Sequence, residues 1–166
     1  MVSPPATNTA LADCGTWVGP YGILKSLVGV WSLNRSVDNG ASMTGTATIA
    51  HQRDGQFQYC ERGLLRLADG QTVESHRRYI FEELPDGFRV LFADSPPRLF
   101  HRIILDKTGP NLAGSGSHVC IEDRYDSRYQ FRCDGTFVVE HVVRGPRKHY
   151  TISTRYLRRF RKIRAA

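Results

Sequence analysis

Gly29-Val30-Trp31 opens a series of short strand-like segments that continues as far as Arg155-Tyr156. Turn signals separate the segments, and the hairpin dipeptide Asp-Gly occurs four times, at 54–55, 69–70, 86–87 and 134–135. The expected strands are 29–36, 43–51, 55–66, 71–83, 86–93, 98–105, 117–124, 127–133, 136–144 and 148–159. The repeated alternation of strand and turn indicates an all-β chain.

The connections between these segments are too short for helical crossovers, so neighbouring strands should run antiparallel in up-and-down order. About ten strands can close on themselves, and closure removes the unpaired strand edges of an open sheet. We therefore predict a single up-and-down antiparallel β-barrel of about ten strands. A short helical turn at 24–28 should lead into the first strand and cover one end.

The length of the chain, 166 residues, suits one domain, and its composition is that of a globular protein, with 40% hydrophobic and 23% charged residues. The first twenty or so residues are rich in Pro, Thr, Ala and Gly. We expect a flexible N-terminal tail at 1–22, a barrel domain at 23–160 and a basic C-terminal tail at 161–166.

The formal net charge is +7, and six Arg and Lys residues between 155 and 164 lie in a segment without acidic residues. The body of the chain is therefore almost neutral. A solvated end that keeps the protein soluble is favoured, and nucleic acid is an unfavoured partner. The alternative is an interaction module whose basic tail contacts nucleic acid or another anionic surface.

Localisation is expected to be cytoplasmic, with no membrane partner. No apolar run approaches the roughly 20 residues that span a bilayer, and the first twelve residues lack the basic and apolar regions of a secretory signal. The four cysteines, Cys14, Cys60, Cys120 and Cys133, should then be thiols. Their spacing matches neither a zinc ribbon nor a thioredoxin-like site.

Period-2 alternation assigns side chains to the inner face of the barrel. Tyr59 and Glu61 share one face of the third strand, and Lys148, Tyr150 and Tyr156 share one face of the last. A packed core does not normally bury such polar groups without partners. The pattern therefore indicates a polar-lined cavity or an internal set of hydrogen bonds.

The densest group of reactive side chains is His118-x-Cys120-x-x-Asp123-x-Tyr125. An imidazole and a thiol on one face of a strand could bind zinc or a haem iron, or could activate a nucleophile. Metal sites usually recruit three or four protein ligands, and no further Cys or His has the typical spacing. A structural or ligand-contact role is therefore favoured for this group.

A second group, Arg144-Gly145-Pro146-Arg147-Lys148-x-Tyr150, surrounds a tight turn between the last two strands. Arg144 or Lys148 pointing into the barrel mouth would recognise a carboxylate or a phosphate. The alternative is an ordinary charged hairpin tip in solvent.

A third group is Tyr59-x-Glu61-x-Gly63, in which Glu61 is expected to be a buried carboxylate paired with an arginine, with Arg78 on the neighbouring strand as its partner. A catalytic role of Glu61 is the alternative. His101 and His141 could face the cavity, where either could be a proximal haem ligand. Haem is the one cofactor considered, and no cofactor is otherwise predicted.

These motifs, together with Arg35, Arg78-Tyr79, Phe92-x-Asp94 and Phe100-His101, resemble a bacterial family of short proteins known as a domain of unknown function, over about residues 27–158. The resemblance implies a calycin-like barrel, similar to lipocalins, fatty-acid-binding proteins and nitrobindins. It implies an architecture and no activity.

The leading functional hypothesis is a small-molecule-binding barrel with an anionic or amphiphilic ligand in its cavity. The candidate ligand-binding residues are Tyr59, Glu61, Arg78, His118, Cys120, Asp123, Tyr125, Arg144, Lys148 and Tyr150. The alternatives are an enzyme that uses His118 or Glu61 as acid or base, and the interaction module described above. A homodimer also stays open.

The opening motif should close one end of the barrel. Gly29 would allow a close approach there, Trp31 would plug the end, and a last-strand cation, Arg155 or Arg158, would cap the indole. Function is then expected at the opposite, open end.

Overall fold

Tight turns at Asp-Gly dipeptides form four of the hairpins of this protein, whose computed structural model describes residues 17–160. Gly55 and Gly70 have φ angles of 82° and 89°, in the left-handed region that glycine adopts without steric cost. The residue before each glycine fixes the turn further: Asp54 Oδ1, for example, accepts a hydrogen bond of 3.1 Å from the backbone N–H of Gln56.

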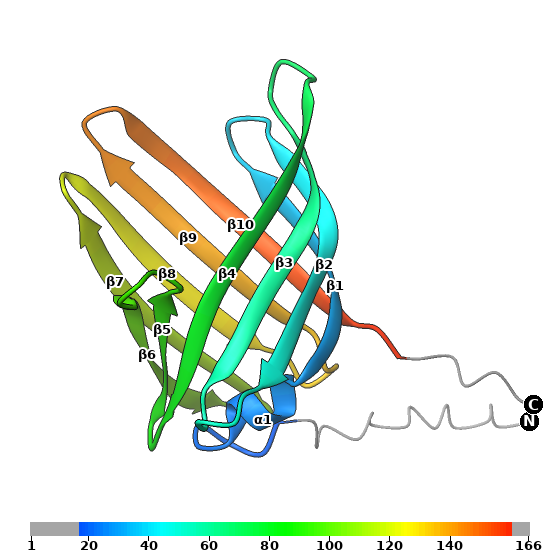
Figure 1. Ribbon diagram of the computed structural model, residues 1–166, viewed down its shortest axis with the longest axis vertical. Coiled ribbons are helices and arrows are strands. Elements are labelled where there is room, and N and C mark those ends of the chain that lie inside the picture. Colours follow the sequence, from blue (N-terminus) through cyan, green and yellow to red (C-terminus); the bar gives the residue numbers. More distant parts are fainter. Residues whose placement is uncertain (1–16, 161–166) are drawn as a thin grey trace, which may run out of the picture.

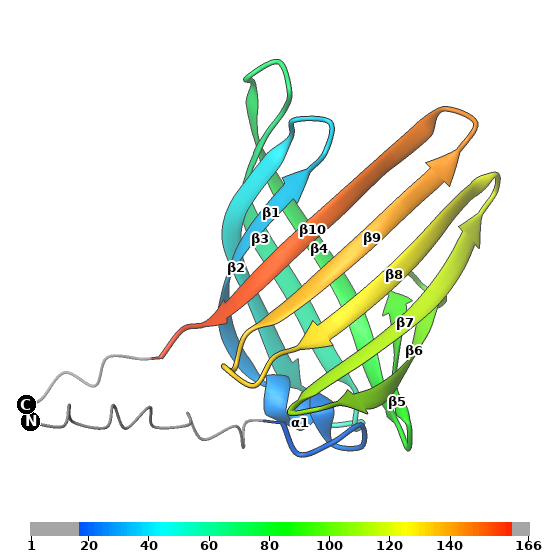
Figure 2. The ribbon, with the colours of Figure 1, turned by 180° about the vertical axis from the view of Figure 1, so that it is seen from behind.

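Hairpins link ten antiparallel strands into a closed barrel, which confirms the predicted fold class (Figure 1). After α1 (Ile23–Leu27), the strands are β1 (Gly29–Val37), β2 (Ser42–His51), β3 (Phe57–Arg66), β4 (Thr72–Leu84), β5 (Gly87–Phe92), β6 (Arg98–Thr108), β7 (Asn111–Cys120), β8 (Asp123–Phe131), β9 (Phe137–Gly145) and β10 (Lys148–Arg158). Each strand pairs with the next along the chain, and β1 also pairs with β10 (Figure 2).

One end of the barrel is closed by α1, which lies across it in Figure 1. Ile23, Leu24 and Leu27 are buried there, and the Trp31 Nε1–H donates a hydrogen bond of 2.9 Å to the Leu27 carbonyl. The aromatic rings of Phe88, Phe131 and Phe137 complete this apolar end. The closed half of the barrel is therefore lined almost entirely by apolar side chains.

The cation that caps Trp31 is Arg158, whose guanidinium carbon lies 4.3 Å from the ring centroid. Arg158 also donates hydrogen bonds to the carbonyls of Val28, at 2.9 Å, and Ser26. A Cβ at Gly29 would lie 2.9 Å from Arg158 Nη1, so the glycine gives this side chain room. Arg155, proposed alongside Arg158 for this role, is instead exposed on the outer face.

The boundary between β7 and β8 differs from the expected one. A strand was expected at 117–124, but β7 runs over Asn111–Cys120 and the turn lies at Ile121-Glu122. Ile121 has a φ of 58°, a conformation that β-branched residues rarely adopt, so the sequence carries no turn signal there. Asp126, which falls between the expected strands 117–124 and 127–133, lies within β8, and its carboxylate accepts hydrogen bonds from Ser117, Arg124 and Arg144.

The packed part of the chain extends into the predicted N-terminal tail. Trp17 donates a hydrogen bond of 2.6 Å to the Arg132 carbonyl, and its ring lies 5.3 Å from that of Phe131. The remainder of that predicted tail, 1–16, and the predicted basic tail, 161–166, lie outside the described residues. No helix between residues 17 and 160 is long and apolar enough to cross a membrane.

Candidate functional site

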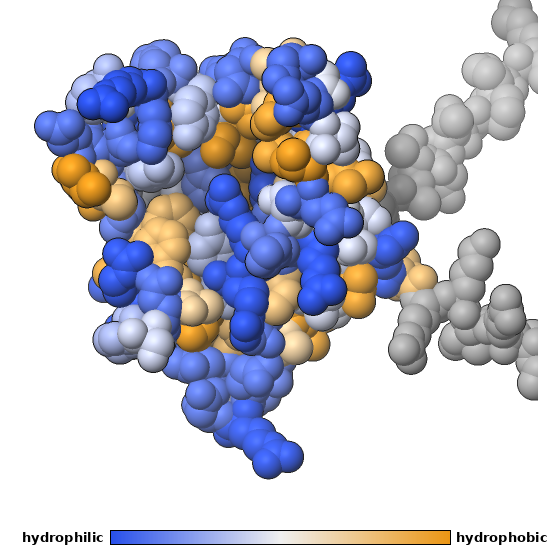
Figure 3. All heavy atoms as spheres, turned by 45° about the horizontal axis from the view of Figure 1, so that its top comes forward, coloured by the Kyte–Doolittle hydropathy of each residue, from blue (hydrophilic) through white to orange (hydrophobic). Residues whose placement is uncertain are grey.

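The interior of the barrel holds a cavity of about 230 Å³ that continues from the apolar closed end toward the opposite end. Figure 3 brings this opposite end forward and shows hydrophobic surface within a largely hydrophilic rim. Apolar residues dominate the lining at depth, among them Leu27, Ile49, Phe81, Phe88, Val90, Phe131 and Phe137. Three charged residues also line it: Arg35, Glu61 and Arg77.

An ion pair between Arg35 on β1 and Glu61 on β3 spans the intervening strand β2 on the inner face of the barrel. Arg35 Nη1 and Nη2 donate hydrogen bonds of 2.8 Å to Glu61 Oε1 and Oε2, and Arg35 Nε donates to Thr154 Oγ1 at 2.8 Å. Tyr59 donates to Glu61 Oε2 at 2.5 Å, and its hydroxyl lies 2.9 Å from that of Tyr156. The Glu61 side chain is only 1% exposed, so these partners replace its water.

These contacts fix the charge state of Glu61. Burial raises the pKa of its carboxyl, but the hydrogen bonds and the positive charge of Arg35 outweigh burial, so the pKa lies below its ordinary value. Burial together with the neighbouring Tyr156 hydroxyl and the Glu61 charge raises the pKa of Tyr59 well above its ordinary value. A carboxylate held in a bidentate pair is poorly suited to exchange protons with a substrate, which argues against Glu61 as acid or base.

Arg77 on β4 is the charged lining residue without an ion-pair partner among residues 17–160. Its Nη1 lies 3.4 Å from the Tyr79 hydroxyl, and its side chain is exposed. Because Arg35 and Glu61 neutralise one another, Arg77 gives the cavity lining a net positive charge. The arrangement suits an anionic group better than a neutral or cationic one.

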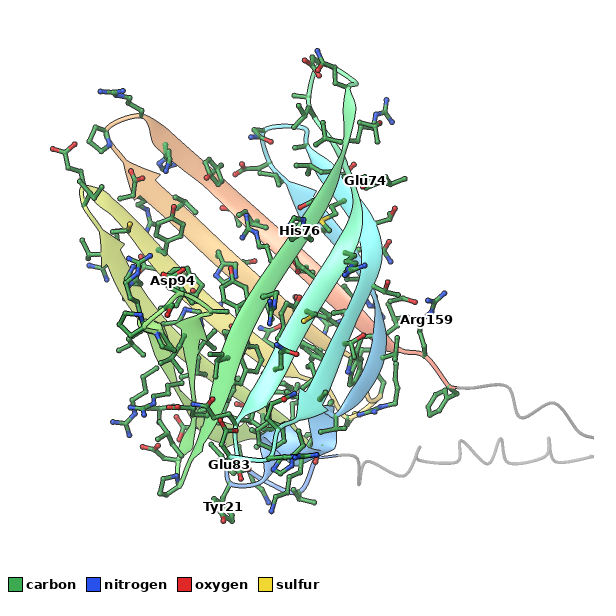
Figure 4. The ribbon with its side chains drawn as sticks, viewed as in Figure 1. Tyr21, Glu74, His76, Glu83, Asp94 and Arg159 are labelled. Carbon is green, nitrogen blue, oxygen red and sulfur yellow. The ribbon has the colours of Figure 1, made fainter. Side chains whose placement is uncertain are left out.

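The exposure of Arg77 follows from the unequal lengths of β4 and β5. The two strands pair only from Tyr79 to Leu84 on β4, so residues 72–78 of β4 pair with β3 alone in the described sheet. Figure 1 shows β5 ending well below the far end of β4, and Figure 4 marks Glu74 and His76 on this half of β4. Arg77 thus lies beside an unpaired strand edge, where the interior meets solvent.

A buried cluster of two histidines and a serine adjoins the cavity. Ser127 Oγ lies 2.7 Å from His141 Nδ1 and 3.4 Å from His101 Nδ1, and His101 Nε2 lies 3.0 Å from the Tyr129 hydroxyl. Burial, reinforced by neighbouring groups, lowers the pKa of His101 to about 3 and that of His141 to about 4, so both imidazoles are neutral at pH 7. His141 also lines the cavity.

The first predicted group of site residues lies together on one hairpin but outside the cavity. His118, Cys120, Asp123 and Tyr125 belong to two strands of one hairpin, in which Cys120 lies opposite Asp123 and His118 opposite Tyr125. Cys120 is exposed at the rim, whereas the His118 ring lies 5.5 Å from that of Phe100. Burial and the nearby charge of Arg98 lower the pKa of His118. Of this group, none lines the cavity.

Two cations of the last hairpin, Arg144 and Lys148, are paired with local carboxylates. Lys148 Nζ donates to Asp123 Oδ2 at 2.5 Å, and Arg144 Nη1 donates to Asp126 Oδ2 at 2.9 Å. Arg144 is exposed on the outer face, so the expectation that it points into the mouth is wrong. Tyr150, from the same hairpin, does line the cavity. The two cations expected to hold an anion at this turn, Arg144 and Lys148, are therefore already paired.

Arg78 was expected to pair with Glu61, and this expectation is wrong because Arg78 lies opposite Cys60 on the outer face of the sheet. The partner is Arg35, and the arginine of β4 that faces the cavity is Arg77. Side chains alternate between the two faces of a strand, so a register with Tyr79 and Phe81 inside also places Arg77 inside. In the same way, a register with Trp31 inside places Arg35 inside. The signal was therefore present in the sequence.

The described residues contain no group of three or more His, Cys, Asp or Glu side chains arranged to hold a metal ion. For haem, His101 is a poor candidate because both of its ring nitrogens face hydrogen-bonding partners. His141 has Nδ1 against Ser127, which leaves Nε2 for the cavity. The cavity volume lies below the roughly 300–1,000 Å³ of sites that enclose drug-sized ligands, so haem does not fit it as it stands.

Comparison with known proteins places the barrel in a family. The model of a family described as "Family of unknown function (DUF6314)" matches residues 27–158, a range that spans all ten strands. Curated proteins gave no match. A de novo designed fluorescence-activating β-barrel is similar at 16% identity and a TM-score of 0.44, over 80% of this chain and 93% of that one. A structure of EF1p2_mFAP2b bound to DFHBI is similar at 10% identity and a TM-score of 0.42, over 84% and 98%.

Proposed function

The chain belongs to the DUF6314 family, and we propose that its barrel binds a small amphiphilic anion, with the anionic group at Arg77 and the apolar part in the closed half of the cavity. The observation that carries this proposal is the lone cation of Arg77 in a cavity whose other charges, among the described residues, are paired. A guanidinium suits a carboxylate because it offers two parallel N–H donors.

The apolar part of the cavity supports the second half of the proposal. Phe81, Phe88 and Val90 form adjoining walls, with the Phe81 and Phe88 rings stacked at a centroid distance of 5.8 Å. An alkyl chain placed against these walls would gain about 25 cal/mol for each Å² of apolar surface removed from water. The volume of about 230 Å³ limits the ligand to one smaller than a typical drug.

Octanoate and octanol form a matched pair of probes for this proposal, because they share an alkyl chain and differ in charge. Isothermal titration calorimetry at pH 7.5 should show octanoate binding more tightly. A hydrogen bond to a charged group contributes about 1.5–3 kcal/mol, which corresponds to about a 10- to 150-fold preference. Arg77→Gln should bring the two affinities close together by weakening octanoate alone.

Arg78→Gln is the matched control, because the neighbouring arginine lies on the outer face of the same strand. It should leave the octanoate preference intact. Equal affinities for octanoate and octanol in the unaltered protein would contradict the proposal, as would equal effects of the two substitutions.

Three further expectations stay predictions. A cytoplasmic location agrees with the free thiols of Cys60, Cys120 and Cys133. The second is a homodimer, and the third is the disfavoured contact of the basic tail with nucleic acid; neither involves the cavity. Size-exclusion chromatography of the full chain with light-scattering detection would give the oligomeric state.

A further inference from the structure

His141 has one nitrogen committed to the buried cluster and one directed to the cavity. Its Nδ1 lies 2.7 Å from Ser127 Oγ, and the ring lines the cavity that Arg77 also lines. Ser127 is 2% exposed, and its hydroxyl carries a single proton, which it can donate to only one of the two flanking imidazoles. The protonation of His141 is therefore coupled to both the cluster and the contents of the cavity.

Two arrangements of protons satisfy the cluster when both imidazoles are neutral. In the first, Tyr129 donates to His101, His101 to Ser127 and Ser127 to His141, which leaves an N–H at His141 Nε2 facing the cavity. In the second, His141 donates to Ser127, Ser127 to His101 and His101 to Tyr129, which leaves a lone pair at His141 Nε2 facing the cavity. In the empty barrel the cations Arg35 and Arg77 favour the second arrangement, because a lone pair is attracted to positive charge.

An anion in the cavity would change this preference. The anion would introduce a negative charge next to His141, which faces two cations in the empty barrel. It would also offer a hydrogen-bond acceptor to His141 Nε2. The cluster can accept the resulting imidazolium without an unpaired donor: His141 Nδ1–H donates to Ser127, and Ser127 donates to His101 Nδ1.

We propose that His141 is the second anchor of the anion subsite beside Arg77, and that it takes up a proton from the solvent when a monoanionic head group binds at mildly acidic pH. The inference rests on the proposed function, because it requires an anion in the cavity. It adds a recognition residue and a direction of pH dependence: the complex tightens as the pH falls.

The groups that surround His141 agree with this direction. They are Arg35 from β1, Glu61 from β3, Arg77 from β4, His101 from β6 and Tyr129 from β8. Glu61 is held by Arg35, so the local excess is positive in the empty barrel. Burial together with these cations keeps the pKa of His141 at about 4, and the bound anion offsets the cations. An opposite charge within hydrogen-bonding reach raises a histidine pKa by about 1–3 units.

Octanesulfonate is the probe for the test, because its charge does not change with pH. Calorimetric titrations at pH 5.5 in two buffers of different ionisation enthalpy give the number of protons taken up. A rise of about 1–3 units from the unliganded value corresponds to an uptake of about 0.2–0.9 proton at pH 5.5 and below about 0.1 at pH 8. The affinity should increase by up to about 30-fold between pH 8 and pH 5.5.

His141→Asn should abolish the uptake, because the asparagine oxygen can still accept from Ser127 but offers no titrating nitrogen. His118→Asn is the matched control: His118 lies against the same Phe100 ring as His141 but does not line the cavity, and its uptake should match that of the unaltered protein. Should His141→Asn fail to fold, the ¹⁵N shift of His141 Nε2 with and without the probe at pH 5.5 reads the same protonation directly.

Binding of octanesulfonate without proton uptake, or an uptake that survives His141→Asn, would overturn this inference and leave the proposed function standing. Loss of the proton uptake in His118→Asn would also overturn this inference and leave the proposed function standing. A failure of the probe to bind at any pH would overturn both.

Discussion

The Arg35–Glu61 ion pair makes a quantitative prediction about stability. Arg35→Met removes two of the three hydrogen bonds that Glu61 accepts, at 2.8 Å each, and leaves the Tyr59 hydroxyl as its partner. The carboxylate is 1% exposed, so in the folded protein it depends on these partners and not on bulk water. Leaving one member of a buried pair uncompensated costs about 3–5 kcal/mol, a large share of the roughly 5–15 kcal/mol that stabilises a typical domain.

Urea unfolding followed by tryptophan fluorescence measures this cost at pH 7. The double substitution Arg35→Met/Glu61→Leu removes both charges and should recover most of the lost free energy, since an apolar pair of similar size is often neutral. Arg78→Met on the outer face of β4 is the control and should change stability by less than about 0.5 kcal/mol. A cost of Arg35→Met below about 1 kcal/mol, or a double variant as unstable as the sum of the singles, would refute the reasoning.

Two other predictions concern the histidine cluster and the closed end. The pKa values of His101 and His141, about 3 and about 4, lie below the ordinary 6.5, so the unfolded chain binds protons first and stability falls as the pH drops below 6.5. The loss should be about 1.4 kcal/mol per pH unit for each histidine, and a flat profile of urea unfolding between pH 7 and 5 would contradict it. Arg158→Ala should cost about 1–3 kcal/mol, because it removes the cation over Trp31 and two hydrogen bonds to carbonyls. The exposed Arg155→Ala should cost under about 0.5 kcal/mol in the same assay, and equal costs would contradict the assignment of Arg158.

The barrel could be predicted from the sequence because its turns carry local chemistry. Asp54-Gly55 and Asp69-Gly70 set hairpins through glycine conformation and side-chain hydrogen bonds, which depend only on neighbouring residues. The exception is the turn at Ile121, where an isoleucine adopts a left-handed conformation that its own side chain disfavours. Here the pairing of two long strands overrides the local preference, and a sequence pattern does not report that.

The candidate site was predicted less well, because a cavity depends on which of two adjacent residues faces inward. Arg77 and Arg78 are chemically identical and differ only in the face they occupy. Lys148 was expected to bind a ligand, but Asp123 on another strand holds it. Such pairings join residues that lie far apart in the sequence, so they follow from the register of β8 to β10 and not from any motif.

The most direct test of the central claim is the location of a bound anion. Nuclear Overhauser effects measured on ¹³C-labelled octanoate in complex with the full chain should connect its terminal methyl group to Val90 and Phe88, and its carboxyl end to Arg77. That pattern would place the alkyl chain in the closed half of the barrel and the anionic group beside the unpaired edge of β4. Contacts confined to the rim or the outer face, for example to Lys148 or Arg78, would contradict the account.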